Sequence, residues 1–476
     1  MKKSVAILLS VLMLASLAAC SSSSDPGTVS TEVQPEDAQK TGVEAIDTVG
    51  ADGIDWNHMS ADELYEMAKA EGGTITIYST STDADTARKY IRDVYPDLNF
   101  EFISCDTDTV KDKVEMEADS GNVMADVLMV KDASGEIYNE LVLYNVVDVY
   151  YPADICEHID PKLLQYGMPL YSTFNPWFYN TRMFPDGVPI ESWWDIVEGY
   201  NEETQSYKDA SGKSTQKWTI YSKGITSPSY AALWSQLIVD GDALAEQYKA
   251  QYGKDLTITY NGHLKNTPGV MELPENNAGV ELFWRFSQML ITPLADGDAV
   301  VEAVHDSVNG PTLGLCSASK LDNSKQSMGE NGFDIAWVTG LKPYTAQNSA
   351  SYSYVVTGCD NPAGARLFIN FMMGGSDGQS GCYQVFDKLG HWSVRDDVTY
   401  QKSGIAFEDV GLTAPDYKQV YANYPNVKTY WNLWNSTRYS VSISRGGFIP
   451  PRAVESHGVP QWQKNVLQYR EKSISF

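Results

Sequence analysis

The chain is predicted to fold as an α/β protein whose first part contains a largely parallel sheet. Residues 74–78 (TITIY) form an apolar, β-rich run that predicts a buried strand. Strand patterns recur at residues 99–104 and 125–130, and helical patterns separate the strands at residues 84–95 and 109–120. This β-α-β-α-β order implies parallel strands with helices packed on the faces of the sheet.

A run of hydroxyl side chains follows the first strand. Ser79, Thr80 and Ser81 stand between this strand and the next helix. In open α/β sheets, ligands bind beyond the carboxyl ends of strands, where helix amino termini and short polar side chains converge. The same residues are also ordinary helix caps, so the pattern allows either a ligand-binding wall or capping alone.

The amino terminus has the features of an export signal. Lys2 and Lys3 precede an apolar run over residues 5–14, and Leu17-Ala18-Ala19 leads directly to Cys20. This pattern resembles a bacterial lipobox. The apolar run is too short for a membrane span, which needs about 20 residues. We therefore expect residues 1–19 to be a lipoprotein signal peptide and Cys20 to carry the lipid that holds the protein on the outward face of the cell membrane.

The residues after Cys20 are predicted to form a tether. Residues 20–57 contain four consecutive serines, scattered prolines and acidic residues, and no sustained apolar period. Such a composition favours a solvated linker over a packed domain.

The charge balance excludes one class of partner. The chain has 62 acidic and 35 basic side chains, a formal net charge of −27. Nucleic-acid-binding surfaces are basic, so this composition argues against nucleic acid. It does not predict a cation site, because net charge describes solubility and steering more than any one pocket.

The remaining five cysteines do not form a recognisable pattern. None of them has C-x-x-C spacing, which argues against a zinc site. One or two disulfides are possible outside the membrane, and buried free thiols are the alternative. The five residues are Cys105, Cys156, Cys316, Cys359 and Cys382.

Sequence motifs of catalytic and metal centres are missing. The six histidines are scattered without an H-E-x-x-H pattern, and there is neither a G-x-S-x-G nucleophile elbow nor a P-loop. We therefore expect a protein without catalytic activity, without a resident metal and without a cofactor.

The order of several segments indicates a family. GGTITIYSTS at residues 72–81, FYNT at 178–181 and DNPAGARLFI at 360–369 together resemble bacterial extracellular solute-binding proteins, most closely their ferric-iron-type branch. The resemblance covers about residues 72–400. It implies a monomeric receptor that binds a small molecule and delivers it to the permease subunits of an ABC importer.

The resemblance also implies an architecture of two α/β lobes joined by crossing strands, with the ligand held between them and closure by hinge motion. We expect the crossings near residues 171–180 and 337–352. The predicted divisions are residues 58–171 with 345–400 for the first lobe, 172–344 for the second lobe, and 401–476 for a C-terminal segment that packs on both.

The predicted ligand site departs from the iron-binding members. Those proteins supply adjacent tyrosines after the strand that corresponds to residues 313–316, whereas this chain has Ser317-Ala318-Ser319 there. Ferric iron prefers anionic oxygen ligands, which serines do not supply, so the resemblance does not imply a metal site in this chain. Hydroxyls and helix amino termini suit a small oxyanion or a phosphorylated or polyol compound. The expected ligand-binding residues are Ser79, Thr80, Ser81, Asp132, Tyr171, Thr173, Ser227, Ser229, Ser317 and Ser319.

Three alternatives stay open. Tyr171 could stack on a sugar ring or simply pack in the core. The ligand could be ferric iron after all. From another class, the 12 tryptophans and 29 tyrosines would suit a surface lipoprotein that binds or hydrolyses glycans.

Overall fold

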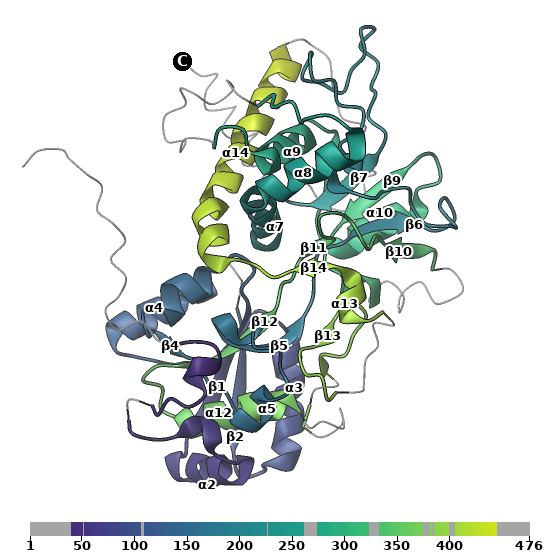
Figure 1. Cartoon of the computed structure of the whole chain (residues 1–476). Coiled ribbons are helices and arrows are strands. Elements are labelled where there is room, and N and C mark those ends of the chain that lie inside the picture. The colour runs from purple at the N-terminus through teal and green to yellow at the C-terminus, as the bar shows by residue number, and fades with distance from the viewer. Residues whose placement is uncertain are drawn as a thin grey trace, which may run out of the picture. The chain divides into compact units, whose positions relative to one another are not determined.

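The computed structural model contains two large β-sheets and, within the described residues, a separate two-stranded sheet (Figure 1). The predictions for residues 1–39, including Cys20 and its lipid, and for residues 445–476 lie outside the described residues. The described residues are 40–50, 52–105, 109–225, 227–260, 274–322, 333–374, 381–382, 385–398 and 405–444.

The first sheet has the strand order β13-β5-β12-β3-β1-β2, and β4 also pairs with β12. The central strand β1 is parallel to β2 and β3, whereas β12 enters antiparallel to β3 and β5. The sheet is therefore mixed, and the predicted parallel pairing is right only for β1, β2 and β3. The strands are β1 (Thr74–Ser79), β2 (Asn99–Ser104), β3 (Val127–Lys131), β4 (Val147–Asp148), β5 (Met168–Ser172), β12 (Ser351–Val356) and β13 (Trp392–Ser393).

Helices of the first lobe are held by side-chain caps and by core contacts. Ser60 and Glu63 form a capping box at the start of α2, and Glu71 at the end of α2 accepts hydrogen bonds from the amides of Ala363 and Gly364 at the start of α12. Each such cap contributes about 1 kcal/mol. The helices are α2 (Ala61–Glu71), α3 (Asp83–Val94), α4 (Val110–Ser120), α5 (Ala153–Cys156) and α12 (Pro362–Met373), with the π-helical turn η3 (Ile137–Val142) and the 3-10 turn η4 (Leu164–Tyr166).

The second sheet has the order β10-β6-β9-β7-β8. Alternate residues of its strands face opposite helical layers. Trp177 packs with α7 and α9 in one core, whereas Phe178 packs with α10 in another. The elements are β6 (Trp177–Asn180), β7 (Thr219–Lys223), β8 (Ile291–Leu294), β9 (Thr312–Leu315), β10 (Ile335–Trp337), α6 (Trp193–Ile196), α7 (Pro228–Val239), α8 (Gly241–Tyr252), α9 (Ala278–Ser287) and α10 (Gly297–Asp306).

A glycine sets the distance between this sheet and α10. A Cβ atom on Gly314 of β9 would lie 2.6 Å from Val304 Cγ2 and 2.8 Å from Val300 Cγ1. Because real Cβ contacts are longer, only glycine allows α10 to approach the strand this closely.

Two crossing segments join the lobes, which confirms the predicted two-lobed fold. The chain leaves the first sheet after β5 and enters the second at β6, and it returns between β10 and β12. The amide of Ser349 on the returning segment donates a hydrogen bond of 2.8 Å to the carbonyl of Thr173 on the outgoing one. The two crossings are thus directly bonded.

The structure corrects the predicted length of the tether. Residues 40–57 were expected to be part of a solvated linker, but they include the 3-10 turns η1 (Val43–Ala45) and η2 (Trp56–His58). Ala45 and Trp56 are buried in the core of the first lobe, and Asn57 Nδ2 bonds the carbonyl of Ala45. A few apolar residues were enough to dock this segment, although they form no periodic pattern.

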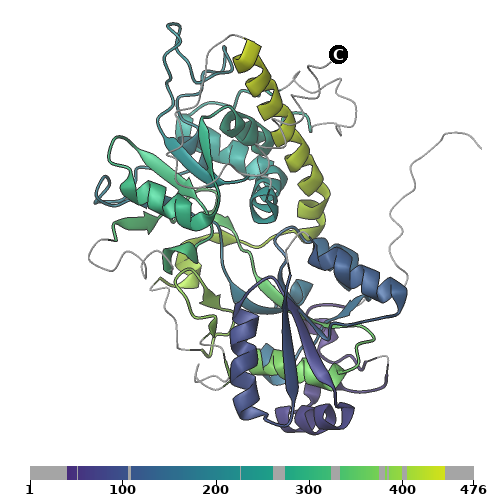
Figure 2. The ribbon, with the colours of Figure 1, turned by 180° about the vertical axis from the view of Figure 1, so that it is seen from behind.

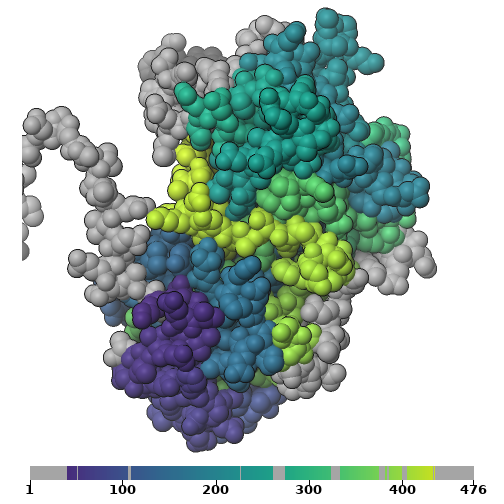
Figure 3. All heavy atoms as spheres, viewed as in Figure 1, coloured from purple at the N-terminus to yellow at the C-terminus, as the bar shows by residue number. Residues whose placement is uncertain are grey.

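The C-terminal segment contacts both lobes. It contains α13 (Phe407–Val410), β14 (Leu412–Thr413), which pairs with β11 (Ala346–Gln347), and the long helix α14 (Tyr417–Ser444). Tyr417 is buried in the first core, whereas Tyr424 and Trp434 are buried in the second. Figure 2 shows α14 running along the second lobe, and in Figure 3 the yellow residues lie between the blue and the teal ones.

Within the described part of the chain, no helix has both the length and the apolar character needed to cross a membrane. The five cysteines at positions 105 to 382 are all free thiols, so the predicted alternative of buried thiols holds for Cys156, Cys316 and Cys382.

Candidate functional site

A small cavity lies where the first lobe meets α7 and α14. Its volume is about 140 Å³. Most of its wall comes from the carboxyl end of β3 and the turn that follows, and one residue each comes from α4, α7 and α14. The lining residues are Lys111, Val130, Lys131, Asp132, Ala133, Ser134, Glu136, Ile137, Pro228 and Lys428. Ala133 also packs against Ala232 of α7 and Val420 of α14, which closes the cavity on that side.

Lys131 is the unusual residue of this cavity. It ends the buried strand β3, which pairs with β1 on one side and β12 on the other. Its ammonium group makes no hydrogen bond or ion pair with any described residue. Burial lowers its pKa to about 8, against a smaller opposing effect of Asp83. A cation in such a position favours a bound negative charge.

The amino terminus of α7 supplies a second feature that suits an anion. Ser227 is the N-cap and Pro228, at the first turn, lines the cavity. The Ser227 hydroxyl oxygen is buried without a hydrogen-bond partner among the described residues. The free N–H groups and the dipole of a helix amino terminus stabilise anions. Lys131 and α7 therefore present positive charge from opposite lobes.

Other charges line the same cavity. Lys428 lies over the ring of Tyr424 at 4.2 Å, and Lys111 forms an ion pair of 2.6 Å with Glu140. Two carboxyl groups, Asp132 and Glu136, also line the wall. The cavity is thus mixed in charge, with three lysines against two acids.

A cluster of buried polar groups stands behind Lys131. Lys388 pairs with Asp83 at 2.5 Å. Burial, helped by the nearby charges of Lys131 and Lys388, lowers the pKa of His391 to about 3. The imidazole is therefore neutral near pH 7, and its Nδ1 donates to the carbonyl of Phe386 at 3.1 Å.

Tyr171 is part of this cluster and not of the cavity wall. Its ring is stacked with those of His391, at a centroid distance of 4.3 Å, and Phe386, at 5.4 Å. The residue is only 4% exposed, and burial raises the pKa of its hydroxyl. The geometry matches the alternative of core packing better than stacking on a sugar.

Asp132 has a structural role in addition to its place at the cavity. Its carboxylate accepts a hydrogen bond of 2.9 Å from the amide of Tyr138 at the start of η3. Burial nevertheless raises its pKa to about 7. The folded protein therefore prefers the neutral acid, and this contribution to stability is lost as the pH rises through 7.

Asp132→Asn is expected to stabilise the protein by about 1–3 kcal/mol near pH 8, because asparagine keeps the acceptor oxygen without the buried charge. Urea denaturation near pH 8 and near pH 4 measures the effect. The gain should vanish near pH 4, where the native carboxyl group is already neutral. An equal gain at both values would show that charge is not the cause.

The other residues expected to bind ligand lie outside the cavity wall. The Ser79 hydroxyl is used in its own turn, where it accepts from the amide of Ser81 at 3.0 Å. Ser317 and Ser319 bond each other at 3.1 Å. The hydroxyl of Thr173 is buried without a partner in the described part of the chain, and the carbonyl of Ser229 accepts from Asn175. The amide of Thr80 donates to the carbonyl of Met129.

Of the expected residues, the cavity thus brings together Asp132 and the α7 terminus that begins at Ser227. Lys111, Lys131 and Lys428 were missed. Lys131 carried a usable signal, since a lysine closes an otherwise apolar strand immediately before Asp132.

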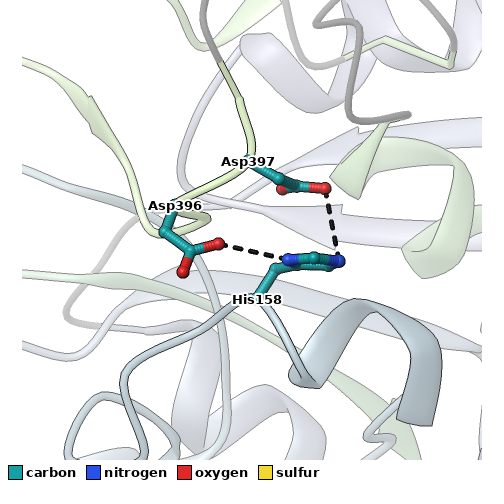
Figure 4. Close-up of side chains that lie close together, drawn as sticks. All are labelled: His158, Asp396 and Asp397. Atoms are coloured by element: carbon teal, nitrogen blue, oxygen red, sulfur yellow. Dashed lines mark hydrogen bonds and ion pairs between the residues drawn. The ribbon is translucent and has the colours of Figure 1, made fainter.

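A second group of side chains has the composition of a metal site. His158, Asp396 and Asp397 place one ligand atom each within 4.8 Å of one another (Figure 4). However, Arg395 already makes two hydrogen bonds to Asp397, of 2.9 and 2.8 Å. The amide of Asp396 also donates to the carbonyl of His158. These side chains are therefore paired with one another and with Arg395, and their contacts hold the segment after β13 on the first lobe.

Comparison with known proteins supports the fold. The sequence matches no protein-family model and no curated protein. The structure is similar to the apo ferric ion-binding protein A of Pasteurella haemolytica, with a TM-score of 0.54 and 11% identity over 77% of this chain and 98% of that one. It is also similar to iron-bound HitA of Pseudomonas aeruginosa, with a TM-score of 0.53 and 11% identity over 76% and 99%. A third similar structure, the ferric binding protein of Campylobacter jejuni, has a TM-score of 0.51 and 11% identity over 76% of this chain and 98% of that one. The chain has the two-lobed fold of periplasmic binding proteins, and at this identity the likeness extends to the fold alone.

Proposed function

We propose that this protein is a lipid-anchored substrate-binding protein that holds a small oxyanion or phosphorylated compound between its lobes and delivers it to an ABC importer. The main support is Lys131, whose ammonium group makes no hydrogen bond or ion pair with the described residues, at a cavity that α7 faces from the other lobe. The fold supports the transport role, since the similar structures are binding proteins.

A bound anion would satisfy groups that have no partner now. Its charge would pair with Lys131, and its oxygens would accept from the Ser227 hydroxyl at the start of α7. The small volume, about 140 Å³, favours a compact ligand. The anion would also hold the two lobes together, because its ligands come from both.

Ferric iron is the weaker candidate, although the similar proteins from Pasteurella haemolytica and Pseudomonas aeruginosa are named for it. A ferric site needs several anionic oxygens. Here Ser317 and Ser319 follow β9 and bond each other. The lysines of the cavity would also repel a cation.

A thermal-shift screen tests the proposal. The probes are inorganic phosphate, sulfate, methylphosphonate, glycerol 3-phosphate, ferric citrate, glucose and spermidine. A tight ligand at about 100 times its Kd stabilises the folded state by about 2.7 kcal/mol, which raises the melting temperature measurably. We expect stabilisation by at least one of the phosphorus or sulfur oxyanions. Stabilisation by ferric citrate or spermidine alone would contradict the assignment.

A further inference from the structure

The second lobe contains a larger cavity, away from the site between the lobes. Its volume is about 390 Å³, within the range of about 300–1,000 Å³ that is usual for small-molecule sites. Its walls come from α6, the loop after α6, α8 and α9, and neither the first lobe nor α14 contributes. The lining residues are Trp194, Val197, Glu198, Gly199, Tyr200, Asn201, Glu202, Glu203, Tyr248, Tyr252, Lys254 and Arg285.

Aromatic rings form one side of this cavity. Trp194 contacts Tyr248 at a centroid distance of 5.1 Å, and Tyr248 contacts Tyr252 at 4.7 Å. Trp194 and Tyr248 are buried, whereas Tyr252 is 40% exposed. The row of rings therefore ends in one that is accessible from solvent.

Arg285 supplies a donor from the protein interior. The residue is 5% exposed and lies over Tyr200, with 4.9 Å between Cζ and the ring centroid. Its Nε bonds Glu281 at 2.7 Å, and its Nη2 bonds Glu202 at 3.3 Å and the carbonyl of Thr257 at 3.0 Å. Its Nη1 has no hydrogen-bond partner among the described residues. Arg285 therefore offers a hydrogen-bond donor at the wall of the cavity.

The charges of the lining residues disfavour an ionic ligand. Glu202 is paired with Arg285, and Glu198 is paired with Lys217 at 2.8 Å. A cation would meet Arg285 and Lys254, and an anion would meet three glutamates. A neutral molecule with many hydroxyls can accept from Arg285, donate to the glutamates and place its C–H face on an aromatic ring.

We propose that this cavity of the second lobe binds a neutral saccharide, independently of the site between the lobes. Tyr252 is the stacking platform, and Arg285 Nη1 and the Glu203 carboxylate are hydrogen-bonding partners for ring hydroxyls. Because every wall belongs to one lobe, saccharide binding requires no motion of the lobes.

Isothermal titration of the full-length protein with maltotriose, cellotriose and chitotriose tests this proposal. We expect at least one of them to bind with a Kd of about 1 mM or lower. Tyr252→Ala should weaken that binding by about tenfold or more, whereas Tyr252→Phe, which keeps the ring, should retain it. Tyr144→Ala is the matched control, because Tyr144 is a 60% exposed tyrosine of the first lobe.

Several outcomes would overturn the proposal. These are the lack of binding of all three saccharides at about 10 mM, unchanged affinity in Tyr252→Ala, or an equal loss in Tyr144→Ala. Lys131→Met serves as a further control, because it alters only the site between the lobes. If that variant lost saccharide affinity, the sugar would occupy the other site and the assignment to the second lobe would be wrong.

Discussion

Replacing Lys131 by methionine is expected to weaken binding of the anionic ligand by about thirtyfold or more, because removing one member of a buried charge pair costs about 2–5 kcal/mol. The same substitution should stabilise the free protein. Burial lowers the pKa of Lys131 to about 8, so the charged form is unfavourable in the folded state. The gain should be about 1–3 kcal/mol near pH 7.

This pair of opposite effects separates a role in binding from a general loss of folding. Isothermal titration measures the loss of affinity, using the oxyanion that stabilises the protein in the thermal-shift screen. Urea denaturation measures the gain in stability of the free protein. Lys162→Met is the matched control, since Lys162 is an exposed lysine of the same lobe. Unchanged affinity in Lys131→Met would remove Lys131 from the site.

The pH dependence of binding follows from the same residue. In the free protein Lys131 loses its proton around pH 8, whereas a bound anion would hold the proton on it. Affinity should therefore fall as the pH rises above about 8, by up to about tenfold per pH unit. In the Lys131→Met variant, this decrease of affinity with rising pH should be missing. Comparing the two proteins with one ligand cancels any titration of the ligand itself.

The second large effect is expected at Glu281. Glu281→Ala should destabilise the second lobe by about 3–5 kcal/mol, because it leaves the buried Arg285 without its main counter-ion. The Glu281 carboxylate is fully buried and accepts from the amides of Thr259 and Tyr260 as well as from Arg285 Nε at 2.7 Å. Alanine removes all of these bonds at once.

Urea denaturation followed by tryptophan fluorescence reports on this lobe, because every described tryptophan except Trp56 packs in or against its core. Glu246→Ala, at an exposed position of α8, is the control and should change stability by less than about 0.5 kcal/mol. A change in Glu281→Ala as small as in the control would show that Arg285 finds adequate partners elsewhere.

Much of the fold could be predicted because its signals are local. Apolar runs with clear boundaries located β1 and β3, and helical patterns located α3 and α4. The strand β7 was missed, since its sequence TIYSK is short and partly polar. The antiparallel entry of β12 was also missed, because it depends on where the chain returns after the whole second lobe.

The candidate site was predictable only in part for the same reason. Asp132, which lines the cavity, and Ser227, which precedes the lining residue Pro228, were singled out because strand ends and helix starts are visible in the sequence. The burial of Lys131 is not visible there, since it depends on β12 and on the segment around His391, each more than 200 residues away. Tyr171 was ambiguous because its stacking partners, Phe386 and His391, are equally distant in sequence.

The helix α14 restrains rotation of the two lobes about their crossing segments. A protein with two crossing segments can open by rotation about them alone, but here Tyr417 is anchored in the first core and Tyr430 in the second. The helix is therefore a brace across the hinge. Its weakest point is the turn that ends at Pro425, which cannot donate a backbone hydrogen bond and follows Tyr424, the first of the helix residues buried in the second core. To open, the molecule must bend the brace at this proline or pull one end of it out of a core.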